Sequence, residues 1–390
     1  MSDPPRLHGR DIVCVGFADW DTELWTNQHH LMSRLARDNR VLFVESLGLR
    51  RPQLAGRDIK RIVRRLRRGL APPRPVDGLH VLSPLVLPFH RYRIVRDLNR
   101  RLLPVLVRRA TRRLGFERPI LWAYVPQAEV LIDALDPELV VYHCVDDIAA
   151  QERIDTASFR AAEDRFAAWA DLVLASAPAL GERLRTISSN VMDAPNVADT
   201  ELFSTALELG PLDPEMAALP TPRIVFTGAI VAMKIDLPLL VELARLRRTW
   251  SFALVGPIGP GEPNTDVAAL IAEPNIHLLG PRSYSELPEV LRAADAGLIP
   301  YARNTLTESI FPMKVYEYLA TGLPVIATPL PALADVAEVA TAPDAQGIAA
   351  LLEEALAADN PERRAERSRA AASHSWDRRL EEIAVAIEDL

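Results

Sequence analysis

Three charged side chains lie close together in the stretch TESIFPMKVYEYLATG, residues 307–322: Glu308, Lys314 and Glu317. Pro312 suits the first position of a helix, where its missing N–H needs no partner. The start of a helix attracts anions, and Lys314 on the first turn can face the same anion. Glu317, one turn later, can accept two hydroxyl hydrogen bonds from a ribose. The pattern therefore indicates a nucleoside diphosphate site, and the alternative is an exposed ion pair at helical spacing.

Length and composition limit the class of protein. The chain has 390 residues, which favours two domains over a single core. Its 49% hydrophobic and 25% charged residues are ordinary for a globular protein. Cys14 and Cys144 lie far apart in apolar runs, which indicates buried thiols in a reducing compartment, without a disulfide framework or metal site. No signal-peptide pattern and no run near ~18 apolar residues is present, so we expect a cytoplasmic protein.

Short apolar runs alternate with amphipathic helical segments along most of the chain. The runs are hydrophobic throughout, which is typical of parallel strands covered on both faces. The alternation predicts parallel sheets with right-handed crossovers. The expected strands are 11–17, 40–46, 79–84, 119–125, 139–145, 171–176, 223–229, 251–257, 276–281, 296–301 and 324–329, and the clearest helices are 23–38, 157–170, 237–248 and 284–295.

The pattern pauses in a polar, proline-containing segment and then restarts. This predicts two Rossmann-like α/β domains facing each other across a cleft, where ligands bind at the carboxyl ends of the strands. The expected division is an acceptor domain at 1–196, a linker at 197–222, a nucleotide-sugar domain at 223–360, and a C-terminal helix at 361–390 returning to the first domain.

Several familiar motifs are missing from the sequence. It contains no Walker lysine loop, no G-x-G-x-x-G after the first strand, no H-E-x-x-H and no G-x-S-x-G. This argues against an ordinary kinase, dehydrogenase, metalloprotease or serine hydrolase. No Asp-x-Asp triplet is evident either, so we expect no metal and no cofactor, with a helix dipole and Lys234 acting in place of a cation.

Motifs over nearly the whole chain resemble those of the family 4 retaining glycosyltransferases, which have the GT-B fold of two facing Rossmann-like domains. In the second half the resemblance rests on FTGAIVAMKIDLPLLVELA, SFALVGP, NIHLLGPRSYSELPEVLRAADAGLIPY and FPMKVYEYLATGLPVIATPLP, in the family's order. APNVADTELF resembles the family's hinge segment. The first half, with WDTELWTNQHHLMSRLA, PILWAYVP and VVYHCVDD, looks most like the branch that makes teichuronic acid.

The resemblance assigns a role to individual residues. Glu317 matches the glutamate that binds the donor ribose, and Lys234 matches the lysine that neutralises the diphosphate and its leaving-group charge. Leu279 and Gly280 match the backbone that reads the base. The remaining donor-side positions are two glycines that admit the nucleotide and a loop that faces the sugar and diphosphate: Gly228, Gly256, Ile310, Phe311, Pro312, Met313 and Lys314.

The sequence departs from the family pattern at two places. Ser309 stands where the family has the first of two glutamates, the one that holds the transferred sugar, and Glu308 lies one position further upstream. Sugar recognition is therefore open. The arginine that usually precedes the diphosphate lysine is replaced by Ala229 or a neighbour, and we expect Lys314 to supply the missing charge.

The first half offers candidates for the acceptor side. His143 ends a predicted strand, and the resemblance implies that it touches the transferred sugar; the alternative is a packing role. Asp146 and Asp147 either orient an acceptor hydroxyl or cap the next helix. The residues at the start of the first helix line the acceptor side or form an ordinary helix surface: Asn27, Gln28, His29 and His30.

Positive charge is concentrated in one segment. Between Arg50 and Arg118 stand 20 Lys or Arg and 4 Asp or Glu, a charge of +16, so the rest of the chain carries −23 of the total of −7. The simplest interpretation is two solvated amphipathic helices. The alternatives are a peripheral contact with anionic lipids on the inner face of the membrane, which suits a lipid-linked acceptor, and nucleic-acid binding, which no reader motif supports.

These observations together predict a metal-independent retaining hexosyltransferase. It would move a sugar from a nucleoside diphosphate sugar to a small-molecule, lipid-linked or glycan acceptor, in the synthesis of cell-envelope polysaccharide, glycolipid or a secondary metabolite. One alternative is a nucleotide-sugar epimerase or hydrolase with the same donor pocket. Another is a non-catalytic nucleotide-sugar-binding subunit, suggested by Ser309 and the absent arginine. The base, the sugar, the acceptor and the oligomeric state are not specified by the sequence.

Overall fold

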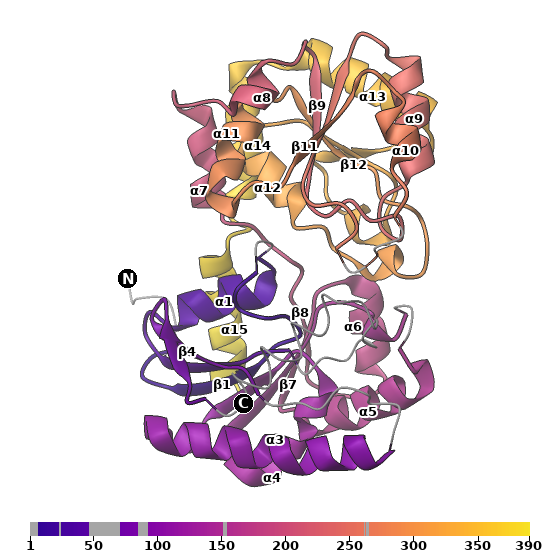
Figure 1. The fold of residues 1–390 in the computed structure, drawn as a ribbon. Coiled ribbons are helices and arrows are strands. Elements are labelled where there is room, and N and C mark those ends of the chain that lie inside the picture. The colour runs from indigo at the N-terminus through magenta and orange to yellow at the C-terminus, as the bar shows by residue number, and fades with distance from the viewer. Residues whose placement is uncertain are drawn as a thin grey trace. The chain divides into compact units, whose positions relative to one another are not determined.

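The computed structural model describes residues 7–22, 25–46, 71–84, 93–150, 154–260, 262 and 265–390. The chain divides into two compact units (Figure 1). One runs through Pro195 and includes Leu380–Leu390, and the other is Asn196–Arg379. The chain therefore crosses between units twice, at 195/196 and at 379/380.

The first unit is built on a sheet in the order β3-β4-β2-β1-β5-β6-β7-β8. Neighbouring strands are parallel except for the edge pair β3–β4. The order reverses direction between β1 and β5, which makes their carboxyl ends the switch point where open α/β sheets bind ligands. The strands are β1 (Asp11–Val15), β2 (Arg40–Val44), β3 (Arg74–Val76), β4 (Leu79–Leu82), β5 (Ile120–Ala123), β6 (Leu139–Cys144), β7 (Leu172–Ala175) and β8 (Val191–Asp193).

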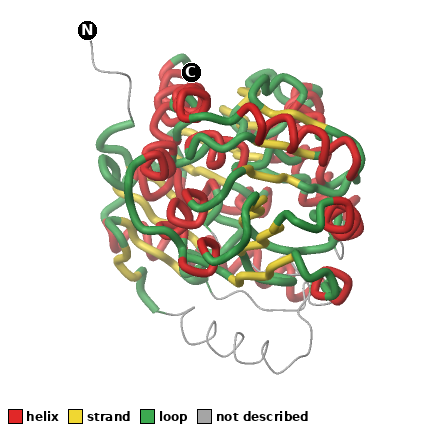
Figure 2. Tube along the Cα trace, turned by 90° about the horizontal axis from the view of Figure 1, so that it is seen from above, coloured by secondary structure: helices red, strands yellow, loops and turns green. Residues whose placement is uncertain are grey.

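Alternate strand residues of the first sheet face a core that four helices complete: α3 (Arg93–Leu114), α4 (Ile132–Leu135), α5 (Thr156–Trp169) and α6 (Pro178–Arg185). The strand β1 is buried over its whole length, as expected for a central strand covered on both faces. Helix α1 (Asn27–Leu35) follows β1, and the short turns η1 (Pro126–Leu131) and η2 (Ile148–Ala150) follow β5 and β6. Figure 2 shows the strands lying between helices.

The second unit has a parallel sheet in the order β11-β10-β9-β12-β13-β14, with its switch point between β9 and β12. Its strands are β9 (Arg223–Thr227), β10 (Ser251–Val255), β11 (Ile276–Gly280), β12 (Ala296–Ile299), β13 (Val325–Ala327) and β14 (Val339–Thr341). Its helices are α7 (Thr200–Ser204), η3 (Thr205–Leu207), α8 (Pro214–Ala217), α9 (Leu237–Leu246), α10 (Ala268–Ile271), η4 (Tyr284–Glu286), α11 (Leu287–Arg292), η5 (Thr307–Ser309), α12 (Lys314–Ala320), η6 (Pro331–Leu333), α13 (Ala345–Ala358) and α14 (Pro361–Ala371). The last helix, α15 (Trp376–Glu388), begins in this unit and continues into the first.

The predicted α/β class with two parallel sheets is confirmed, and each predicted strand is present. The sequence patterns missed β3, β8 and β14, each of three residues with at most one of them buried. Such strands lack the continuous apolar run that marks the equally short but fully buried β13 (Val325–Ala327). The segment predicted as a linker is folded onto the second unit, where Ala198, Phe203 and Met216 are buried in the core. The whole of α14 belongs to that unit too, and the chain enters the first unit only at Leu380.

A close backbone approach joins the ends of β9 and β10 in the second unit. A Cβ atom on Gly256 would lie 2.0 Å from the Gly228 carbonyl oxygen, and Gly256 has φ +155°. The Gly228 amide also donates to the Val255 carbonyl at 2.7 Å. Position 256 therefore excludes any side chain on both steric and conformational grounds.

We expect Gly256→Ala to lower the free energy of unfolding by about 3 kcal/mol or more, because backbone must move to admit the methyl group. Gly280→Ala is the matched control, since Gly280 has φ +71° but nothing within 4 Å of an added Cβ. It should lose only about 1 kcal/mol, the conformational cost alone. Urea unfolding of both variants measures the difference, and equal losses would contradict the steric explanation.

Candidate functional site

The candidate donor site lies at the switch point of the second sheet. The loop after β9, residues 228–236, and the loop after β12, residues 300–313, flank this point, and α12 follows the second loop. The two loops are bound to each other, since the Ala302 amide donates to the Lys234 carbonyl at 2.9 Å and the Asp236 amide donates to the Pro300 carbonyl at 2.9 Å. The sequence candidates in both loops are thus brought together by β9 and β12.

Tyr318 fixes α12 across this switch point. Its ring lies against β12 where Gly297 leaves room, since a Cβ there would be 2.3 Å from the Tyr318 ring. Its hydroxyl accepts the Thr227 amide hydrogen at 2.8 Å, at the end of β9. Burial raises the pKa of the Tyr318 hydroxyl, so it stays protonated and neutral. One side chain therefore connects α12 with two strands.

Lys314 is the first residue of α12 and lies against the β9 loop. Its Nζ would be 2.7 Å from a Cβ placed on Gly228, so the missing side chain of Gly228 leaves room for the lysine. The ammonium also lies over the Phe226 ring, 5.5 Å from the centroid, a cation–π distance. The glycine predicted to admit the nucleotide thus also admits the lysine predicted to bind it.

Glu317 is buried, with 5% of its surface exposed. Desolvation raises the pKa of its carboxyl group, and the nearby Lys314 charge and a hydrogen bond with the Tyr284 hydroxyl oppose that rise. Tyr284 itself packs edge-on against Phe203 at 5.4 Å. A buried carboxylate is costly unless it is paired or binds something, so this position is unusual for a side chain without a function. Because Glu317 is buried, the alternative interpretation of an exposed ion pair at helical spacing is wrong.

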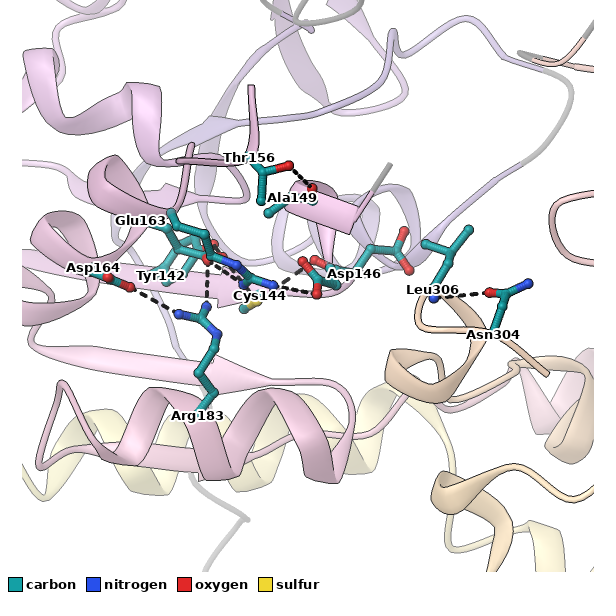
Figure 3. A network of polar contacts seen from close by, with 12 residues as sticks. Tyr142, Cys144, Asp146, Ala149, Thr156, Glu163, Asp164, Arg183, Asn304 and Leu306 are labelled. Carbon is teal, nitrogen blue, oxygen red and sulfur yellow. Dashed lines mark hydrogen bonds and ion pairs between the residues drawn. The ribbon is translucent and has the colours of Figure 1, made fainter. Parts of the chain in front are cut away.

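Lys234 is half-buried in the β9 loop. Among the described residues its ammonium group has no ion pair or hydrogen bond, which leaves its charge available to an anion. Asn304 holds this loop against η5: its Nδ2 donates to the Met233 carbonyl at 3.0 Å, and its Oδ1 accepts from the Leu306 and Thr307 amides (Figure 3). The sequence patterns did not identify Asn304, Tyr284 or Tyr318.

The chain contains only three lysines against 42 arginines. Two of the three are Lys234 and Lys314, and the third, Lys60, lies outside the described residues. A lysine presents a compact charge on a flexible stem, whereas an arginine presents a planar fork. In a chain that otherwise uses arginine, lysine at both positions indicates that the compact charge is required there.

The prediction that Pro312 begins the helix is wrong. The helix begins at Lys314 with Met313 as its N-cap, and the Pro312 carbonyl accepts from the Val315 amide at 3.2 Å. The Tyr316 and Glu317 amides bond to the Met313 carbonyl in the same turn. The helix has only seven residues, and its Val315, Tyr316 and Glu317 amides already have acceptors. It therefore has few amides left to bind an anion, and the two lysines must supply most of the positive charge.

The other donor-side candidates lie around this centre. Ser309 is buried in η5 and Glu308 is exposed, so the buried residue of the two is the serine and not the glutamate. Leu279 and Gly280 end β11 at the edge of the sheet. The Leu279 carbonyl accepts from Arg282 Nη1 at 2.7 Å, so a base would share this acceptor with the arginine.

The candidates on α1 are buried within the first unit instead of forming a helix surface. Asn27, Gln28, His29 and His30 are each 4% exposed or less. The Gln28 side-chain oxygen accepts from the Phe17 amide at 3.0 Å, beside the end of β1. Burial lowers the pKa of both histidines, and of His30 more strongly, so both are neutral at pH 7.

His143 was predicted to end its strand at the carboxyl edge, and it lies one residue before that end. The strand β6 continues to Cys144, and the His143 ring is 2% exposed and stacks on Tyr124 with centroids 4.9 Å apart. The packing role is the one that the geometry favours. Contact with a sugar stays a prediction.

Asp147 belongs to a buried ionic network on the face of β6 opposite to His143. Figure 3 shows the network members Tyr142, Glu163 and Arg183. It pairs with Arg160, which also pairs with Glu163 at 3.1 Å, and Glu163 in turn pairs with Arg183. The Tyr142 hydroxyl and the Cys144 thiol donate to the same Glu163 carboxylate. Asp147 therefore has a structural partner. Asp146 is half-buried, and its acceptor-side role stays a prediction. Burial raises the pKa of both thiols, Cys14 and Cys144, so neither is reactive.

The fold defined by these two parallel-sheet units is GT-B. Several solved structures match nearly the whole chain. One is Anabaena HepE in complex with UDP and glucose, which has TM-score 0.66 and 14% identity over 97% of this chain and 99% of that one. Sucrose-phosphate synthase from Thermosynechococcus elongatus has TM-score 0.68 and 15% identity over 97% and 98%. The E. coli trehalose-6-phosphate protein bound with UDP-2-fluoro glucose has TM-score 0.67 and 12% identity over 97% and 99%.

Sequence comparison points to the same class in the second unit. Residues 221–358 match the family described as glycosyl transferases group 1. TuaH of Bacillus subtilis (strain 168), named as a teichuronic acid biosynthesis glycosyltransferase, is 29% identical over 231 residues. That match spans 55% of this chain and only 56% of TuaH. No helix among the described residues is long and apolar enough to cross a membrane.

The buried carboxyl group of Glu317 should make stability depend on pH. Folding raises its pKa, so the folded state binds the proton more tightly than the unfolded chain, whose pKa is about 4.3. The free energy of unfolding should therefore fall as the pH rises from about 4 through the folded-state pKa, and then level off. We expect Glu317→Gln to show a smaller fall than the wild type.

Exposed Glu308→Gln is the matched control and should follow the wild type. Unfolding midpoints measured from about pH 4 to about pH 7.5 give the comparison. Identical pH profiles for Glu317→Gln and the wild type would show that Glu317 is solvated.

Proposed function

We propose that the protein is a retaining glycosyltransferase that moves a sugar from a nucleoside diphosphate sugar to an acceptor hydroxyl, without a metal ion. The observation that carries this proposal is the buried Glu317 carboxylate, one helical turn from Lys314, which lies against the β9 loop that carries Lys234. A carboxylate that accepts two hydroxyl groups beside two ammonium groups matches a ribose diphosphate. The group 1 match over 221–358 supports the same class.

In the proposed reaction the bond between the sugar's anomeric carbon and the diphosphate oxygen breaks. The acceptor oxygen bonds to that carbon, and its proton passes to the departing phosphate, so no protein base is needed. Negative charge develops on the diphosphate as the bond breaks, and Lys234 and Lys314 stabilise it where it forms. Tyr318 and Asn304 hold the two lysines in place through α12 and the β9 loop.

UDP is the nucleotide to test first, because HepE is in complex with UDP and glucose and another structural neighbour is bound with UDP-2-fluoro glucose. We expect UDP to raise the melting temperature of the wild-type protein more than GDP, TDP or ADP, since a ligand that binds only the folded state stabilises it by mass action. Sugar transfer in an acceptor panel, with the product's anomeric configuration read by NMR, tests retention. Inversion would contradict the proposed mechanism.

Both lysines should stabilise the same negative charge, that of the diphosphate. We expect Lys234→Ala and Lys314→Ala each to weaken UDP binding about tenfold or more and to lower turnover further, because leaving-group charge exceeds ground-state charge. Lys314→Arg should restore less UDP binding and turnover than its retained charge alone predicts, because the space beside Gly228 fits a narrow lysine stem better than a planar guanidinium group.

Thermal shift with UDP and steady-state kinetics measure these effects. The exposed Arg303→Ala, in the same β12 loop, is the control and should retain UDP binding. Full turnover in Lys314→Ala with none in Lys234→Ala would show that Lys314 does not replace the missing arginine. Donor consumption without acceptor would favour the epimerase or hydrolase alternative, and nucleotide binding without transfer would favour the binding subunit.

We also propose that the acceptor belongs to cell-envelope polysaccharide or glycolipid synthesis and that the protein meets it at an anionic membrane surface. The described helix α3 contains eight arginines and one acid, Asp97. Its buried face includes Leu103, Val107 and Ala110. Its opposite face carries two exposed apolar side chains, Leu98 and Val105, with 47% and 62% exposure, among the exposed arginines Arg101, Arg108, Arg109 and Arg112. The other basic helix, predicted near 57–70, lies outside the described residues.

We expect Arg108→Glu/Arg112→Glu to reduce binding to vesicles that contain anionic phospholipid by at least tenfold, at about 1 kcal/mol for each arginine near the surface. Arg363→Glu/Arg369→Glu on α14 changes the net charge equally and should bind as the wild type does. Flotation at low and high salt measures both variants. Equal binding to neutral and anionic vesicles would rule out this surface.

A further inference from the structure

The loop that precedes α12 is held by residues next to both points where the chain passes between the two units. We infer that Asn196, Tyr316 and His374 are positioning residues that fix the donor loop 310–313 and connect it to both chain crossings. This inference rests on the proposed function for its meaning, but the contacts that carry it lie wholly within the second unit.

Asn196 makes the contact at the first crossing. It is the first residue of the second unit. Its side-chain Nδ2 donates to the Phe311 carbonyl at 2.9 Å, across 115 positions in sequence. Phe311 lies in the middle of the donor loop and is 4% exposed. Because the bond is to a backbone carbonyl, it fixes the path of the loop and not only one side chain.

A three-ring stack makes the contact near the second crossing. Tyr316 on α12 lies face to face with His374, with centroids 4.0 Å apart and an interplanar angle of 10°. The other side of the stack is Phe311, whose centroid is 5.5 Å from that of Tyr316 at 17°. His374 precedes α15, and the second unit ends at Arg379 on that helix. The ring of Tyr316 therefore contacts both the donor loop and the returning chain.

The two crossing segments are also bound to each other. The Ala198 amide donates to the His374 carbonyl at 3.1 Å, and Ala198 and Ser375 form a parallel bridge. The Ser375 hydroxyl and carbonyl accept from the Arg378 and Arg379 amides, which joins this bridge to the first turn of α15. A displacement of the donor loop by a ligand would therefore be transmitted to both crossings through short, rigid contacts.

These contacts explain why a loop with few regular hydrogen bonds can present a defined surface. Residues 310–312 have no regular secondary structure, and only the single-turn η5 precedes them. A loop that binds a diphosphate must be ordered before the ligand arrives, or the ligand loses affinity in ordering it. Asn196, Tyr316 and His374 provide that order from outside the site.

Hydrogen exchange of the ligand-free protein tests the positioning role directly. We expect His374→Ala to raise amide exchange in residues 310–316 about three- to tenfold, the usual strength of an aromatic pair. His374→Phe keeps a flat ring and should exchange as the wild type does. Both variants retain the His374 carbonyl and its bond to Ala198, so the difference between them measures the ring alone.

Unchanged exchange in His374→Ala, or equal exchange in both variants, would overturn the inference. A rise of the same size in α13 would also count against it, because that outcome is a general loss of stability. Asn196→Ala should raise exchange in the same peptide independently of His374.

The functional consequence has its own readout. In His374→Ala we expect UDP affinity to fall and the KM for the donor sugar to rise, each about three- to tenfold, with a smaller change in kcat. His374→Phe should restore both values. An equal loss in both variants, or a loss confined to kcat, would contradict positioning. If the wild type does not bind UDP, the proposed donor is wrong, and the exchange experiment alone decides this inference.

Discussion

The second unit depends on one side chain, Tyr318, that joins a helix to two strands. Its ring needs the space left by Gly297 on β12, and its hydroxyl accepts the last amide of β9. The switch point of the sheet lies between these two strands. With Tyr318 fixed there, the first turn of α12 must lie over the β9 loop. This is why Lys314 lies against Gly228 and why Glu317, on the inner side of the helix, is buried.

The buried glutamate shows the usual conflict between stability and function. Desolvation makes its charged form unfavourable, and Lys314 and Tyr284 offset only part of that cost. A protein selected for stability alone would place an apolar residue at this position. The same environment makes the carboxylate a strong hydrogen-bond acceptor for any hydroxyl group that displaces water there. In the proposed site a bound ribose would therefore offset part of this cost, and Asn196, Tyr316 and His374 contact the loop that precedes α12.

The first unit uses its polar residues differently. Its buried acids and arginines pair with one another, as Glu163 does with Arg160 and Arg183, and this network connects β6 with α5 and α6. The sequence left Asp147 either to orient an acceptor hydroxyl or to cap the next helix, and the structure instead pairs its carboxylate with Arg160 on α5. Short motifs identify polar residues near strand ends. They do not tell which of these residues point toward solvent and which toward a helix.

The sequence by itself determined the α/β class, the position of most strands, and the placement of Lys314 and Glu317 one turn apart on the same helix, because continuous apolar runs and helical spacing are local properties of the chain. Only the tertiary structure decided where α12 begins, that His143 is buried, and that Tyr284, Asn304 and Tyr318 complete the site. These features depend on contacts between residues far apart in the sequence, such as Thr227 with Tyr318. No periodicity records such contacts, since each residue alone is compatible with many neighbours.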